Sequence, residues 1–90
     1  MLYDSRKLKE VKIKVLFFGI STDVVGTNAL DFLMSGDPTV ADFKEVLVEK
    51  YPSLTELQSY AIAVNEHYAN DEMILKDQDV VAVIPPVSGG

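Results

Sequence analysis

The segment that decides the fold is Val11–Gly19, which reads VKIKVLFFG. Apolar side chains occupy every second position along it, and lysines fill the alternate positions of its first half. This period of two is typical of a β-strand with one face in the core and the other in water. In the second half, Leu16 and Phe18 take the places of the lysines. We therefore expect a strand that is apolar on both faces near its end.

The residues that follow predict a loop and a second strand. Ile20–Asn28 is rich in serine, threonine, aspartate, glycine and asparagine, so we expect a loop with one helical turn there. Ala29–Met34 is a short apolar stretch that we interpret as the second strand. It is followed by Ser35–Pro38, a cluster of turn-forming residues that should end it.

A helix is predicted immediately after this turn. Thr39 has the character of a helix N-cap, and Asp42 three residues later resembles a capping box and places a carboxylate at the positive helix end. Pro52 disfavours helical geometry in the residue before it, so the helix should end near Tyr51. One apolar stripe should face the core and three charged residues should face water; these are Val40, Phe43, Val46 and Leu47, and Lys44, Glu45 and Glu49.

Three further strands are expected after a bridge of mixed polarity at 53–59. They are Tyr60–Val64, a short strand around His67–Ala69 and Val80–Ile84, with turns at Asn65–Glu66 and Lys76–Asp79. The order strand, strand, helix, strand, short strand, strand predicts an α+β fold of two layers, with one main helix packed on one face of a mixed sheet. That order is the β-grasp, or ubiquitin-like, arrangement.

We divide the chain into one domain, residues 11–85, with a flexible N-terminal arm, 1–10, and an extended C-terminal tail, 86–90. The arm carries Arg6, Lys7 and Lys9, and an exposed, fraying end is the expected behaviour. A basic docking arm is the alternative interpretation.

Composition excludes several classes of function. The 90 residues include 8 basic and 14 acidic side chains, a net charge of −6, which disfavours both nucleic acid and an anionic membrane surface as partners. The absence of cysteine excludes disulfides, a thiol nucleophile and cysteine-ligated metal centres. We expect no metal site. Because no apolar run approaches the roughly 20 residues that span a bilayer, and no secretory signal pattern is present, we expect a cytosolic protein.

The side chains offer no convincing active site. Ser21, Thr22 and Asp23 lie together, but with a single histidine in the chain they are better explained as loop residues. His67 is a possible general base, although a surface or half-buried position at a strand end is the simpler interpretation. The pairs Asp71–Glu72 and Asp77/Asp79 lack the spacing and central glycine of a calcium loop, so turn formation accounts for them better.

The C-terminal residues carry the clearest functional signal. Pro85 and Pro86 follow the last strand, and because neither has an N–H they end sheet pairing and keep the departing chain extended. Val87 and Ser88 lead to Gly89 and Gly90, which lack a Cβ and suit a narrow channel in a partner. The reactive group delivered would be the Gly90 carboxylate. A carboxylate becomes reactive once an ATP-dependent partner converts it to an acyl-adenylate.

Three segments carry a family resemblance: Val15–Gly19, Ala63–Glu66 and, above all, the ending Val80–Gly90 with its Pro-Pro-Val-Ser-Gly-Gly sequence. Together they resemble the small, sulfur-carrier subunits of molybdopterin synthase, the MoaD family of ubiquitin-like proteins. The likeness runs from about Lys12 to Gly90. Carriers of the thiamine pathway also end in Gly-Gly but typically lack the double proline, and tRNA-thiolation carriers have a histidine where Ser88 stands.

This resemblance implies a sulfur carrier in molybdenum cofactor biosynthesis. An E1-like adenylyltransferase would adenylate Gly90 with ATP and Mg²⁺, a sulfurtransferase would make the thiocarboxylate, and the large synthase subunit would receive the tail within a heterotetramer of two small and two large subunits. Sulfur would pass to cyclic pyranopterin monophosphate. The catalytic side chains would belong to the large subunit, and this chain would bind no cofactor itself. Sulfur delivery to thiamine or tRNA, ubiquitin-like conjugation and a non-covalent β-grasp adaptor remain alternatives.

A docking surface is predicted on the sheet face away from the helix. If the alternate residues from Val11 to Phe17 face the helix, Leu16 and Phe18 point to the opposite side. Five residues should form this surface: Leu16, Phe18, Tyr68, Ala82 and Ile84. Exposed contiguous apolar groups in an acidic protein indicate partner binding. The alternative is that the chain's own N-terminal arm covers Leu16 and Phe18.

Overall fold

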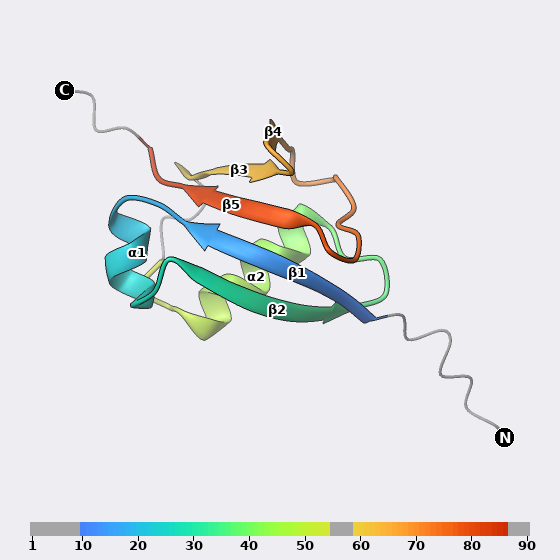
Figure 1. Cartoon of the computed structure of the whole chain (residues 1–90), viewed down its shortest axis with the longest axis horizontal. Coiled ribbons are helices and arrows are strands. Elements are labelled where there is room, and N and C mark those ends of the chain that lie inside the picture. The colour runs from blue at the N-terminus through green and yellow to red at the C-terminus, as the bar shows by residue number, and fades with distance from the viewer. Residues whose placement is uncertain (1–9, 55–58, 87–90) are drawn as a thin grey trace, which may run out of the picture.

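Five strands and two helices form a two-layer β-grasp fold in the computed structural model, which describes residues 10–54 and 59–86 (Figure 1). The strands are β1 (Glu10–Phe17), β2 (Ala29–Ser35), β3 (Ala61–Val64), β4 (His67–Tyr68) and β5 (Val80–Ile84), and the helices are α1 (Ile20–Val25) and α2 (Val40–Lys50). The expected order of elements is confirmed. Glu10, which we assigned to the arm, is the first residue of β1. The remaining arm residues and the tail from Val87 onward lie outside the described residues.

The sheet has the order β2-β1-β5-β3-β4, so the first and last strands of the chain lie at its centre. β1 runs antiparallel to β2 and parallel to β5, while β3 is antiparallel to both β5 and β4. Helix α2 covers one face of this sheet (Figure 1). β2 pairs with β1, β3 pairs with β5 and β4 pairs with β3, so the described sheet extends outward from the central pair of β1 and β5.

The alternation along β1 is realised as predicted. Val11, Ile13 and Val15 are fully buried and Phe17 is nearly so, whereas Lys12 and Lys14 are exposed. Phe32 of β2 meets Phe43 of α2 edge to face, with ring centroids 5.8 Å apart. The whole core cluster is Val11, Ile13, Val15, Phe17, Phe32, Met34, Val40, Phe43, Leu47, Leu54, Ile62, Val64, Leu75, Val81 and Val83. One continuous core therefore joins the sheet to α2.

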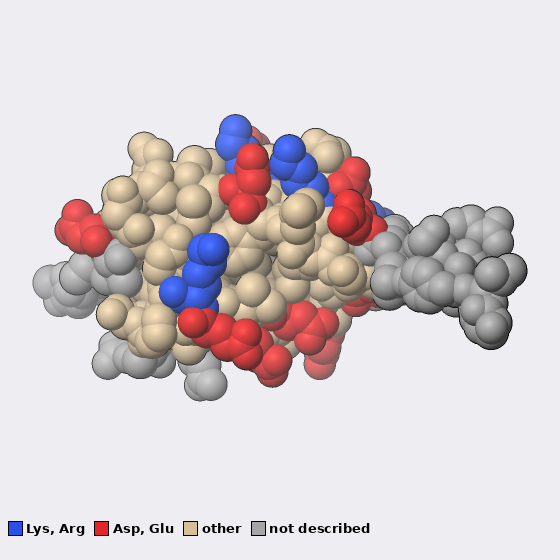
Figure 2. Space-filling view, turned by 90° about the horizontal axis from the view of Figure 1, so that it is seen from below, with Lys and Arg blue, Asp and Glu red and all other residues tan. Residues whose placement is uncertain are grey.

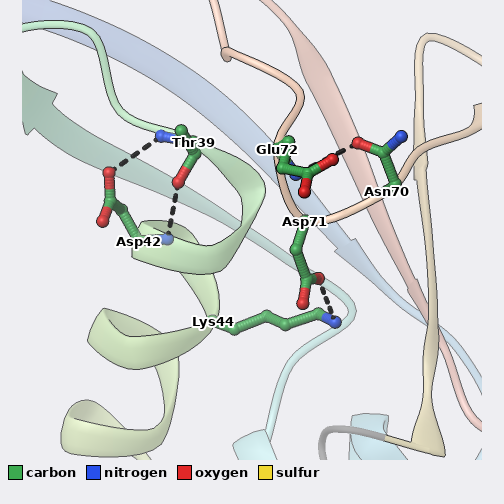
Figure 3. A network of polar contacts seen from close by, with 6 residues as sticks. All are labelled: Thr39, Asp42, Lys44, Asn70, Asp71 and Glu72. Atoms are coloured by element: carbon green, nitrogen blue, oxygen red, sulfur yellow. Dashed lines mark hydrogen bonds and ion pairs between the residues drawn. The ribbon is translucent and has the colours of Figure 1, made fainter.

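Helix α2 begins with the predicted capping box. The Thr39 hydroxyl accepts the Asp42 N–H at 3.1 Å, and the Asp42 carboxylate accepts the Thr39 N–H at 2.9 Å. The helix ends at Lys50 with Tyr51 as its C-cap, as expected from Pro52. Figure 3 shows this cap beside the 70–72 loop, which packs along the same helix.

Two helix residues differ from the prediction. Val46 was expected in the buried stripe but is 37% exposed, because at 100° per residue it lies about 90° from the centre of the stripe formed by Val40, Phe43 and Leu47. Lys44 was expected to face water, yet its side chain is only 19% exposed and forms an ion pair with Asp71 at 2.7 Å (Figure 3). The 70–75 loop, which sequence patterning does not position, accounts for the second difference.

The segment between β1 and β2 is more ordered than a loop with one turn. Ile20–Val25 is a six-residue helix, α1, whose C-cap Gly26 has φ 88°. The turn predicted at Asn65–Glu66 is confirmed, with φ 51° and 73°, the positive pair that a tight two-residue hairpin turn requires. β4 is shorter than predicted by one residue, although Ala69 still donates its N–H to the Ile62 carbonyl at 2.9 Å.

Acidic residues tie the 76–79 turn to the sheet. Asp77 accepts the Lys12 N–H at 2.8 Å, a contact between positions 65 apart in the chain. Asp79 accepts the Lys76 N–H at 2.8 Å and the Asn65 side-chain amide at 2.9 Å. These contacts confirm the interpretation of Asp77 and Asp79 as turn residues.

We predict an acid-dependent loss of stability that originates at Asp77. The hydrogen bond from the Lys12 N–H, assisted by the Gln78 side chain, holds the pKa of this carboxyl below its ordinary value. A pKa that is lower in the folded state than in the unfolded state stabilises above the unfolded pKa of about 3.9, and this stabilisation is lost as the pH falls through the folded value. Asp77→Asn should therefore be less stable than the parent at pH 7, and the difference should narrow in acid.

Urea unfolding of both chains between pH 7 and pH 2 measures this difference. Two stability curves that stay parallel over the acid range would contradict the assignment to Asp77.

Candidate functional site

The five residues predicted to form a docking surface lie together on the sheet face opposite α2. Leu16 of β1 is the register partner of Ala82, which is the partner of Ala63, which in turn is the partner of Tyr68. Residues directly opposite one another in a sheet project to the same face, so these side chains form one row across four strands. We call Leu16, Phe18, Tyr68, Ala82 and Ile84 the outer apolar patch.

Exposure within this patch is uneven. Tyr68 is 79% exposed and Phe18 is 48% exposed, whereas Leu16, Ala82 and Ile84 are half-buried. Phe18 is linked to the last strand by its N–H, which donates to the Val83 carbonyl at 3.3 Å. Two aromatic side chains thus stand at the surface of a small protein, with aliphatic groups between them. Aromatic residues in such positions commonly anchor protein interfaces.

A shallow groove extends the patch towards β2. It has a volume of about 470 Å³ and lies where β1 ends, α1 begins and β2 starts. Its lining combines apolar residues with two polar side chains: Leu16, Phe17, Phe18, Gly19, Thr22, Asn28 and Ala29. The groove and the patch share Leu16 and Phe18, so they form one continuous surface.

The other end of the same sheet face is charged. Lys12 and Lys14 take the positions of Leu16 and Phe18 in the first half of β1, and their partners on β2 are Leu33 and Asp31. Acidic groups also gather along one border of the molecule in Figure 2, where lysines form no continuous basic patch on the face shown. This distribution agrees with a protein partner for the apolar end and gives no support to nucleic acid.

The beginning of the C-terminal tail lies beside the patch. Because β1 and β5 are parallel, their carboxyl ends meet at the same edge of the sheet (Figure 1). Pro85 is half-buried next to Gly19, and Pro86 is exposed. Val87, Ser88, Gly89 and Gly90 lie outside the described residues, so the roles assigned to them stay predictions.

Two of the polar residues singled out in the sequence, Ser21 and Thr22, form hydrogen bonds to the end of β1 and the residue after it. Ser21 is fully buried; its hydroxyl donates to the Phe18 carbonyl and accepts the Phe18 N–H at 3.2 Å. The Thr22 hydroxyl donates to the Phe17 carbonyl at 3.2 Å. His67 is exposed at the start of β4. These contacts explain Ser21 and Thr22 as the residues that hold α1 against the end of β1.

The acidic pairs do not form a cation site. Asp71 is engaged by Lys44, and the Asn70 side chain accepts the Glu72 N–H at 3.0 Å (Figure 3). Within residues 10–54 and 59–86, no group of three or more histidine, aspartate or glutamate side chains is arranged to hold a metal ion. In that same part of the chain, no helix combines the length and apolar character needed to cross a membrane.

Sequence reasoning missed the contact of Gly19 with Pro85, which lies beside the outer apolar patch and is not part of it. Gly19 was interpreted as the end of the first strand, yet it lines the groove and faces the Pro85 ring. A glycine directly after an apolar strand was the available signal, but its importance depends on the last strand of the chain, which the fold brings beside it.

The sheet order and the helix packed on one face define a protein of the β-grasp, ubiquitin-like class. Comparison with known proteins extends this conclusion, because the ThiS family model matches residues 15–90. The chain belongs to the ThiS family.

Relatives and solved structures agree with that membership. The molybdopterin synthase sulfur carrier subunit of Arabidopsis thaliana is 38% identical over 97% of this chain and 92% of its own length. A chain from the complex of subunits 1 and 2 of molybdopterin-converting factor from Helicobacter pylori matches with a TM-score of 0.62 and 31% identity, over 89% of this chain and 100% of that one. SAMP1 from Haloferax volcanii matches with a TM-score of 0.79 and 25% identity, over 88% and 99%.

We predict that Ser21→Ala destabilises the fold without a separate chemical effect. Removing the hydroxyl takes one of two hydrogen-bond partners from each of the backbone groups of Phe18, and the loss of a typical intramolecular hydrogen bond costs about 0.5–1.5 kcal/mol. Ser35→Ala, at an exposed position of β2, is the matched control and should change stability by less than about 0.5 kcal/mol. Urea denaturation measures both. A Ser21→Ala chain that is as stable as the parent but defective in function would restore a chemical role for this hydroxyl.

Proposed function

We propose that this chain is the sulfur carrier of a molybdopterin synthase and that Gly90 carries the sulfur as a thiocarboxylate. The observation that supports this most directly is the position of Pro85 and Pro86, which leave β5 beside the outer apolar patch, in a chain whose family match runs through Gly90. The domain provides the surface that the partner binds, and the tail provides the reactive group.

Activation of the carboxylate requires ATP on a partner enzyme of the E1-like class. A Gly90 carboxylate oxygen attacks the α-phosphorus of ATP, with Mg²⁺ neutralising phosphate charge, and pyrophosphate leaves. A persulfide sulfur of a sulfurtransferase then attacks the acyl carbon, and AMP leaves. A second thiol cleaves the sulfur–sulfur bond, so the acyl carbon keeps one sulfur and the two thiols leave as a disulfide. Because this chain has no cysteine, both thiols belong to the partner.

Delivery of the sulfur takes place on the large synthase subunit. The outer apolar patch docks there, and the thiocarboxylate sulfur displaces an oxygen substituent from a carbon of cyclic pyranopterin monophosphate, so that a C–S bond forms as a C–O bond breaks. Hydrolysis of the acyl–sulfur bond returns the Gly90 carboxylate. Two loaded carriers supply the two sulfurs of the dithiolene, which agrees with a heterotetramer of two small and two large subunits. The Helicobacter pylori match to a complex of subunits 1 and 2 supports a large-subunit partner. The proposed compartment is the cytosol, where ATP is available.

A second function is favoured by one comparison. SAMP1 from Haloferax volcanii, to which the chain is similar, is named small archaeal modifier protein 1. In a modifier, a lysine amine instead of a persulfide attacks the same acyl-adenylate and forms an isopeptide bond. The domain, the tail and the activation step are common to both functions, so the nucleophile that follows activation distinguishes them.

We predict that the chain gains one sulfur when it is incubated with ATP, Mg²⁺, an E1-like activating enzyme and a persulfide donor. Exchange of one carboxylate oxygen for sulfur adds about 16 Da to the intact mass. Deletion of Gly90 should abolish sulfur transfer without unfolding the chain, because it withdraws the reacting carbon by about 3.5 Å and a displacement of 1 Å already costs about 10²-fold. Transfer at the parent rate from the shortened chain would defeat the proposal, and conjugates to lysine would favour the modifier.

We predict that the outer apolar patch binds the large subunit. Phe18→Lys should weaken binding by about 2 kcal/mol or more, roughly 30-fold, because it removes an aromatic anchor and places a charge in the interface. Leu33→Lys is the matched control: Leu33 is 66% exposed on the same sheet face but lies opposite Lys12, away from the patch. Titration calorimetry with the large subunit measures both affinities. Equal affinities for the two variants would remove Phe18 from the interface.

A further inference from the structure

The ladder between β1 and β5 ends where the tail begins. Lys14 donates its N–H to the Asp79 carbonyl and Phe18 donates to the Val83 carbonyl, at 2.9 and 3.3 Å. In a parallel pair with this register, the next bond would run from the N–H of residue 85 to the Phe18 carbonyl. Residue 85 is proline and has no N–H, so this bond cannot form.

The Phe18 carbonyl accepts hydrogen bonds from α1 instead. The Ser21 N–H donates to it at 3.3 Å, and the Ser21 hydroxyl donates to it as well. Ser21 therefore replaces the missing donor on β5. Consequently no backbone hydrogen bond of this ladder holds Pro85 in place, and its position depends on packing.

The packing partner of Pro85 is Gly19. A Cβ built on Gly19 would lie 3.1 Å from Pro85 Cγ and 3.6 Å from Pro85 Cδ, so any other residue at this position would require the proline ring to move by a few tenths of an ångström. Gly19 also has φ 60° and ψ −140°, a combination that is open to glycine and closed to residues with a Cβ. Gly19 thus combines a special backbone conformation with a close approach to the tail.

A fixed position of the Pro85 ring has a large effect on the chain beyond it. The residue before a proline is confined to extended geometry, and both prolines have a fixed φ, so few torsions remain free at this point. Four extended residues reach about 13 Å, and a pivot of about 30° at Pro86 would displace their end by about 7 Å. A displacement of that size is far greater than the tolerance of a reacting group.

We propose that Gly19 is a positioning residue: its bare Cα is the seat of the Pro85 ring, and this contact sets the direction in which the chain leaves the domain. The inference rests on the proposed function, since the direction matters for a carrier that delivers its end to a partner's active site. Gly19 acts through Pro85 and contacts no reacting atom. Its effect belongs to the transfer step and not to docking, which the outer apolar patch provides.

Three variants and one glycine control test this role. Gly19→Ala introduces the clash, Pro85→Ala removes the ring atoms Cγ and Cδ that lie nearest to it, and the double variant combines the two. Gly36→Ala is the control for a Cβ added to a glycine of positive φ without a close neighbour, because Gly36 has φ 78° and a Cβ added there would meet no atom within 4 Å. Each chain is loaded as the thiocarboxylate and mixed with the large subunit and cyclic pyranopterin monophosphate. Two quantities are measured: the rate constant of transfer within the saturated complex and the Kd of docking.

We expect Gly19→Ala to lower the transfer rate constant about tenfold or more while Kd changes less than about twofold. Gly36→Ala should change neither quantity. Pro85→Ala should lower the rate constant by itself, and Gly19→Ala should cause a smaller further loss in this background than in the parent, because the ring that meets the new Cβ is gone and only the backbone strain at Gly19 remains. Equal rate constants for Gly19→Ala and Gly36→Ala, or an undiminished effect of Gly19→Ala in the Pro85→Ala background, would overturn the proposal.

The rate constant of Pro85→Ala and the NMR contacts of the parent chain test the role of Gly19 even if Gly19→Ala does not fold. If Gly19→Ala does not fold, Pro85→Ala carries the test, and an unchanged rate constant for that variant overturns the role. In the free parent chain, nuclear Overhauser effects between the Gly19 Hα atoms and the Pro85 ring are expected. Their absence would show that Gly19 and Pro85 are not in contact and would overturn the proposal. A parent chain that is never loaded with sulfur or never transfers it defeats the proposed function, whereas a parent that transfers normally while all variants match it defeats only the role of Gly19.

Discussion

The parallel pairing of β1 with β5 is the constraint on which the rest of the molecule depends. It joins residues near the start of the described chain to residues near its end, as in the register of Lys14 with Val80 and Phe17 with Val83. Parallel strands end at the same edge of a sheet, so the end of β1, the start of α1 and the departing prolines come together there. An antiparallel arrangement of the same two strands would have separated Gly19 from Pro85 by the length of the strand.

The two faces of β1 differ in burial and in chemical character. The side chains of its inner face are buried in the core along the whole strand. Its outer face changes from lysine to apolar residues along the strand, and Leu16 then finds Ala82 and Tyr68 in its row through the register of three further strands. The outer apolar patch therefore arises from the continuation of an ordinary strand, with no added element. The polar side chains near it, Ser21 above all, complete the backbone hydrogen bonding that the proline leaves open.

Much of the fold was predictable, because its signals are local. The alternation of Val11–Gly19, the capping pair Thr39 and Asp42 and the turn at Asn65–Glu66 act over a few residues, and all three are present as predicted. The errors occurred where a distant segment decides the outcome. Lys44 is drawn from water by Asp71, 27 positions later in the chain, and Val46 lies at the margin of a stripe whose centre is set by packing against the sheet. Helical periodicity shows that a stripe exists, but its direction depends on the sheet it covers.

The sequence by itself determined the order of the elements and the two-faced character of β1, since period, caps and turn residues act on their own neighbours. Only the tertiary structure decided which side chains share a surface. Leu16, Tyr68 and Ala82 come from three separate strands, and strand order together with register places them in one row. The contact of Gly19 with Pro85 is of the same kind. A glycine in a sequence indicates backbone freedom at its own position. Which segment packs against its Cα depends on the tertiary fold.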